Sequence, residues 1–156
     1  MSELKVPTVA LAAEVSCLDG RGFRGRIFVP AGASHHGGAM RPGEWLNEPL
    51  PFFPFLPDDS DTPVLLNKHQ VLVVSVQTAV DAAPLYEEAG AEERKVVVEC
   101  GPRIIEGSFL IQLPENHRRV LDYVNQFELF LTLRDGDRHH FIQKQHVTRV
   151  IEVREG

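Results

Sequence analysis

The two halves of this 156-residue chain carry the same framework residues in the same order. Trp45–Asn47 (Trp-Leu-Asn) is matched by Tyr123–Asn125 (Tyr-Val-Asn), and Leu66–Lys68 (Leu-Asn-Lys) by Ile142–Lys144 (Ile-Gln-Lys). The spacing between matched positions changes only from 78 residues at the two asparagines to 76 at the two lysines. A repeat of this kind constrains the fold strongly, because each copy must build the same supersecondary unit. The sequence therefore predicts two similar modules.

Each half opens with a strand, a turn and a second strand. Apolar residues alternate with other residues from Val9 to Cys17, which is typical of a half-buried strand, and Asp19-Gly20 then predicts a tight turn. The second strand of each half has a glycine in its middle, Gly25 or Gly107. Such a glycine marks a sharp bend or a close approach of two backbones, which small barrels need in order to close. We expect the apolar residues around these glycines to be buried: Phe23, Ile27, Val29, Ile105, Phe109 and Ile111.

A short helix is predicted before the third strand of each half. In the first half it covers 41–47, with Pro42 suited to the first helical position. In the second half it begins near Asn116, a residue that can cap a helix, and runs for two or three turns. The recurrence of Asn at positions 47 and 125 favours a structural cap in both copies.

The predicted fold is mainly β, with two small barrels in tandem. Residues 1–77 form the first module and residues 94–156 the second. An acidic, Ala-rich linker spans 78–93. Units of about 60 residues are marginal on their own, so we expect the halves to pack together or the chain to associate.

Composition limits the compartment and the partners. The net charge is −6, whereas nucleic-acid-binding domains usually carry a basic face. No apolar run approaches the ~20 residues of a membrane span, and the start of the chain does not resemble a signal peptide. We expect a cytoplasmic protein with no membrane contact, in which Cys17 and Cys100 are buried, reduced thiols.

No residue set in the sequence predicts catalysis. His139 and His140 are adjacent, so on a strand they point to opposite faces, and His35-His36 lies in a Gly-rich loop that is more often simply solvated. The serines lack a nucleophile-elbow context, no Gly-rich phosphate loop joins a strand to a helix, and no zinc-ligand spacing is present. We therefore expect a protein that is not an enzyme and that needs no metal or cofactor.

The pattern of strands and glycines resembles the Sm-like family of SH3-type small barrels, including its Hfq-like members. The resemblance rests on Gly107, on Asp122 and Asn125 ahead of Leu131 and Leu133, and on the closing segments. It implies two Sm-like barrels in tandem. The chain also resembles a family of uncharacterised bacterial proteins with a Leu-Asn-Lys-x-His type ending, and that resemblance brings no activity with it.

The closing segments carry the one functional implication of this resemblance. Asn67–Val71 (Asn-Lys-His-Gln-Val) is similar to a Tyr-Lys-His-Ala-Ile segment that contacts RNA in the family, and Gln143–Val147 keeps the lysine. RNA binding by an Sm-like regulator is therefore one hypothesis. Its candidate contact residues are Lys68, His69, Lys144, His146 and Arg149.

The second hypothesis is a non-catalytic interaction or assembly module, because framework residues are duplicated and no reactive set is. Four prolines interrupt the apolar segment 48–57, so this strand is predicted to be an edge or largely irregular. Strand alternation sends Phe53 and Phe55 to one face and Phe52 to the other. We expect these three residues to form a partner-binding edge, most simply for self-association and alternatively for another protein.

Overall fold

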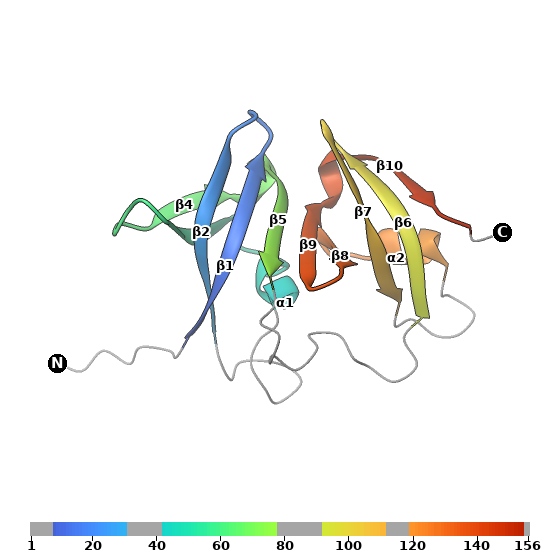
Figure 1. The fold of residues 1–156 in the computed structure, drawn as a ribbon, viewed down its shortest axis with the longest axis horizontal. Helices are drawn as coiled ribbons and strands as arrows, with labels where there is room; N and C mark the ends of the chain where they lie inside the picture. The colour runs from blue at the N-terminus through green and yellow to red at the C-terminus, as the bar shows by residue number, and fades with distance from the viewer. Residues whose placement is uncertain (1–7, 31–41, 78–91, 112–118, 155–156) are drawn as a thin grey trace.

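The computed structural model describes residues 8–30, 42–77, 92–111 and 119–154 (Figure 1). Within them, ten strands form one sheet that does not close on itself, and every pair of neighbouring strands is antiparallel. The described helices are short. The prediction of a mainly β fold is confirmed at this level. Residues 31–41, which contain His35-His36, and Asn116 lie outside the described residues.

The described elements of the two halves follow one order. The first half contains β1 (Thr8–Cys17), β2 (Gly22–Pro30), α1 (Pro42–Leu46), β3 (Phe52–Pro57), β4 (Val64–Asn67), the 3-10 turn η1 (Lys68–Gln70) and β5 (Val71–Gln77). The second contains β6 (Glu92–Cys100), β7 (Arg103–Ile111), α2 (Val120–Val124), β8 (Phe130–Asp135), β9 (Arg138–Gln143), the 3-10 turn η3 (Lys144–His146) and β10 (Val147–Glu152).

The strands lie in the order β10-β6-β7-β8-β9-β5-β1-β2-β3-β4. The two halves meet in the middle, where β5 pairs with β9 from Val73↔Ile142 to Gln77↔Arg138. The strands β4 and β10 are the two ends of the sheet, and they lie on opposite sides of the molecule (Figure 1). Each half therefore contributes one strand to the central joint and leaves one strand at a free edge.

The mid-strand glycines lie where the sheet bends. A Cβ atom on Gly25 would lie 2.0 Å from the backbone oxygen of Leu56, and one on Gly107 would lie 2.6 Å from that of Arg134. Only two residue pairs join β2 to β3, and one joins β7 to β8. Both glycines thus permit the close backbone approach that the sequence predicted.

The predicted hairpin turns are also confirmed. Gly20 and Gly136 both adopt a positive φ, of 90° and 61°, in the turns that follow Asp19 and Asp135. Proline at position 42 begins α1, as its fixed φ favours. The second helix is shorter than expected, because α2 has only five residues and begins after Arg119.

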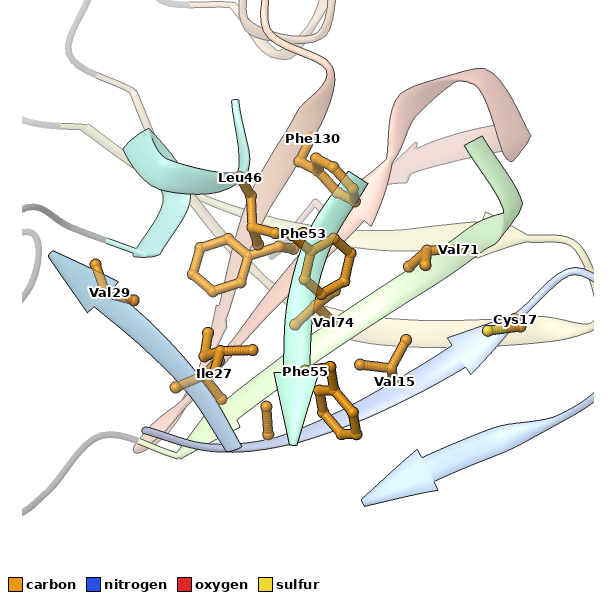
Figure 2. Packing of buried hydrophobic residues seen from close by; sticks show 13 residues of the cluster. Val15, Cys17, Ile27, Val29, Leu46, Phe53, Phe55, Val71, Val74 and Phe130 are labelled. Carbon is orange, nitrogen blue, oxygen red and sulfur yellow. The ribbon is translucent and has the colours of Figure 1, made fainter. Parts of the chain in front are cut away.

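The buried apolar residues form two clusters, one in each half. Figure 2 shows the first, in which Phe53 and Phe55 of β3 lie with Val15, Ile27 and Val74 of the facing strands. The second contains Phe109, Ile111, Leu131 and Leu133, among others. Of the six residues predicted to be buried, five are, and Phe23 is partly buried against the first cluster. Both cysteines are free and buried, as predicted.

The position predicted for the proline-rich strand is wrong. β3 is a regular strand with β2 on one side and β4 on the other, so the edge is β4. The sheet tolerates Pro54 because β2 contacts β3 only at Leu56 and Pro57, which leaves Pro54 with a paired neighbour on the β4 side alone. A residue without an N–H can occupy a strand where one side carries no ladder.

Candidate assembly and binding surfaces

The two lysines of the candidate RNA site bond to the chain itself. Lys68 is buried, and its ammonium donates to the backbone oxygen of Glu48 at 2.9 Å. The ammonium of Lys144 donates in the same way to the backbone oxygen of Gln126. Burial lowers the pKa of both lysines, since it disfavours the charged form. Each lysine thus connects a 3-10 turn to the loop before the third strand of its half.

The two 3-10 turns come together across the joint between the halves. His146 donates from Nε2 to the backbone oxygen of His69 at 2.6 Å, and His69 Nδ1 lies 3.2 Å from Gln145 Oε1. Gln143 is fully buried and donates from its amide to the backbone oxygen of Lys68 at 2.9 Å. Arg149 is on β10, where its guanidinium pairs with Glu99 at 2.6 Å. The structure therefore brings His69 and His146 together and gives Arg149 a separate ion pair.

The three phenylalanines of β3 divide as strand alternation predicted. Phe53 and Phe55 are buried in the first cluster, whereas Phe52 is half exposed. Three other apolar residues around the same edge are also exposed: Leu50, Val64 and Leu65. Of the predicted partner-binding residues, only Phe52 is thus presented at the surface, together with neighbours that the sequence interpretation did not select.

The opposite edge of the sheet is partly apolar too. Ile151 of β10 and Val153, just after it, are exposed, and Phe127 and Leu121 near α2 are more exposed still. The sequence interpretation named none of these four residues. The repeat itself contained the signal, because these residues match positions on the two strands and the helix that form the central joint.

Asn47 fastens the two halves to each other. Its side-chain oxygen accepts from the backbone N–H of Phe130 at 2.7 Å, and its amide donates to the backbone oxygen of the same residue at 3.4 Å. The expectation of a structural cap at both asparagines is therefore wrong for Asn47, which bonds to the other half of the chain. The matched Asn125 is exposed at the end of α2.

The histidine pair of β9 is buried. Burial lowers the pKa of His139 to about 4 and also lowers that of His140. His140 Nδ1 lies 2.7 Å from Ser75 Oγ on β5, and its Nε2 lies 4.0 Å from a carboxylate oxygen of Asp135. The second distance is too long for a hydrogen bond. The short bond instead joins β5 to β9 at the middle of the central joint.

Comparisons with protein-family models, with curated proteins and with solved structures give no match to this chain. Among the described residues, no three His, Cys, Asp or Glu side chains lie together as ligands of one metal ion would. Of the helices in the described ranges, none has the length and apolar character that crossing a membrane requires. The functional argument therefore rests on the geometry of the edges and of the joint.

Proposed function

We propose that this protein is a non-catalytic assembly module, built from two Sm-like small barrels in tandem, whose copies associate through the apolar edge at β3 and β4. No set of reactive groups is repeated between the halves. The features that recur are structural: a bend at a glycine, a short helix, and a lysine that bonds to a loop carbonyl.

Matched strand registers support the tandem arrangement. Val15 of β1 pairs with Val74 of β5, and Val98 of β6 pairs with Val150 of β10. These are equivalent positions, since the lysine-containing segments are also 76 residues apart. The two glycine contacts, Gly25 with Leu56 and Gly107 with Arg134, are equivalent as well. Similar units follow from similar registers.

The observation that carries the proposal is the exposed apolar edge. Phe52 and Leu65 are 51% and 69% exposed, and Leu50 and Val64 lie nearby. An edge strand presents unpaired backbone groups, and proteins usually protect such an edge with charges, prolines or a covering segment. Here the edge residues Val64, Leu65 and Leu66 are apolar. A continuous apolar patch of this kind marks an interaction site.

RNA binding has less support. Lys68 and Lys144 direct their ammonium groups to backbone oxygens, so neither presents a free cation to a phosphate. The features that favour RNA are the exposed His69 and His146 at the meeting point of the two turns. We expect no retention of a labelled single-stranded oligonucleotide at low salt. Retention that falls steeply as salt rises would favour the RNA alternative, because phosphate contacts release counterions.

Light scattering over a range of concentrations tests the assembly proposal. The wild-type chain is expected to give masses that rise with concentration above the 17.5 kDa of one copy. Phe52→Asp is expected to remain a monomer with an unchanged circular dichroism spectrum. Leu18→Asp is the matched control, because Leu18 is equally exposed but lies in the turn after β1. A wild-type mass of one copy at every concentration would contradict the proposal.

A further inference from the structure

The two ends of the sheet match the two strands that meet in its middle. By the spacing of 76 residues, β10 is equivalent to β5, and β4 is equivalent to β9. We propose that β10 of one copy pairs antiparallel with β4 of the next copy, which repeats the β5–β9 joint between molecules. This inference rests on the assembly proposed above and names the surfaces that carry it.

The internal joint fixes the register of this pairing. Within the chain, Val74 pairs with Phe141 and Ser75 pairs with His140. The equivalent positions place Val150 opposite Leu65 of the next copy and Ile151 opposite its Val64. All four residues are apolar. Cross-strand contacts between such side chains stabilise a sheet.

Burial separates the two kinds of position. Phe130 and Phe141 are 0% exposed, and both belong to the first cluster although they come from the second half (Figure 2 shows Phe130 beside Leu46). Their equivalents, Phe52 and Leu65, are the most exposed apolar residues of β3 and β4. The difference between the two sets is that the first has a neighbouring half and the second has none. A second copy at the free edge supplies that neighbour.

The asparagines show the same asymmetry. Asn47 bonds to both backbone groups of Phe130 across the internal joint. The equivalent partner of Asn125 is Phe52 of the next copy. Asn125 is exposed at the end of α2, and Phe52 is half exposed at the start of β3. The proposed pairing therefore brings an unused amide to an edge backbone that needs a partner.

This contact uses two different surfaces, so it is heterologous. Each copy has one β10 edge and one β4 edge, and association continues until a ring closes or a filament grows. A symmetric contact of β4 with β4, or of β10 with β10, would instead stop at a dimer.

Mixing two edge variants distinguishes these arrangements. Leu65→Asp blocks β4 and Ile151→Asp blocks β10, both at exposed positions where the fold tolerates a charge. The two substitutions carry the same sign, so they cannot pair with each other. Each variant alone is expected to be a monomer, and an equimolar mixture is expected to form a 1:1 heterodimer, from the free β10 of the first and the free β4 of the second.

The other outcomes overturn the inference in different ways. If the wild-type chain associates and one variant alone still forms dimers, the contact is symmetric and the head-to-tail pairing is wrong. If the wild-type chain is a monomer, the proposed function fails with it. If both variants are monomers and the mixture stays monomeric, the two edges do not bind each other, although self-association stands.

Asn125→Ala and a cysteine pair test the details. Asn125→Ala is expected to weaken association about tenfold without changing the fold of a single copy. Val64→Cys combined with Ile151→Cys is expected to give a ladder of cross-linked copies on mild oxidation. Val64→Cys with Arg149→Cys, two residues out of register, is the control and is expected to cross-link far less. Equal ladders from both pairs would overturn the register.

Discussion

The bond between Asn47 and Phe130 allows a sharp test of the central joint. Asn47→Ala removes the acceptor of the Phe130 N–H, which it holds at 2.7 Å, and the weaker donor at 3.4 Å. Phe130 is completely buried, so water cannot replace the lost acceptor without opening the joint. Leaving a buried backbone group unsatisfied costs about 1–3 kcal/mol. We expect the free energy of unfolding to fall by about 2 kcal/mol, most of it from the shorter bond.

Urea denaturation followed by circular dichroism measures this loss. With a slope of about 2 kcal/mol per molar urea, the midpoint should fall by about 1 M. Asn125→Ala is the matched control, because the same side chain is removed from an exposed position. Measured in the Leu65→Asp background, where copies cannot associate, it should change the free energy by less than about 0.5 kcal/mol. Equal losses in the two variants would refute the reasoning that the asparagines differ through their partners.

Two further predictions concern the bends and the buried histidine. Gly25→Ala should destabilise the fold by about 3 kcal/mol or more, because its Cβ would lie 2.0 Å from the Leu56 oxygen. Gly22→Ala, whose nearest neighbour would lie at 3.7 Å, should unfold within 1 M urea of the wild type, and equal losses would contradict the clash. Because burial lowers the pKa of His139 to about 4, the unfolded chain binds the proton more tightly below pH 6.5, and stability should fall by about 2 kcal/mol between pH 7 and pH 5. His139→Phe should reduce this pH dependence, and an unchanged dependence would exclude His139 as its source.

Local patterns in the sequence predicted much of the fold. Alternation, the Asp-Gly turns and the mid-strand glycines act over a few residues, so they could be interpreted directly. Phe53 and Phe55 face the core and Phe52 faces outward for the same reason. The short helix after Pro42 also follows from local chemistry.

The rest depends on contacts between distant segments. Nothing near Lys68 in the sequence shows that its ammonium reaches the backbone of Glu48, or that Asn47 reaches Phe130. The place of β3 was mistaken because prolines exclude a ladder only where one is needed, and β2 leaves Pro54 before it is. The candidate edge was incomplete because Val64 and Ile151 become notable only when their buried equivalents are known.

Amide hydrogen exchange at low and high protein concentration tests the central claim most directly. A pairing of β10 with β4 of another copy protects the backbone N–H groups of both edges, which lie at opposite ends of the sheet in a single copy. The account predicts that exchange within 64–67 and within 147–152 slows together as concentration rises, while exchange in the β5–β9 joint does not change. Slowing at only one edge, or at neither edge in a sample that has associated, would contradict it.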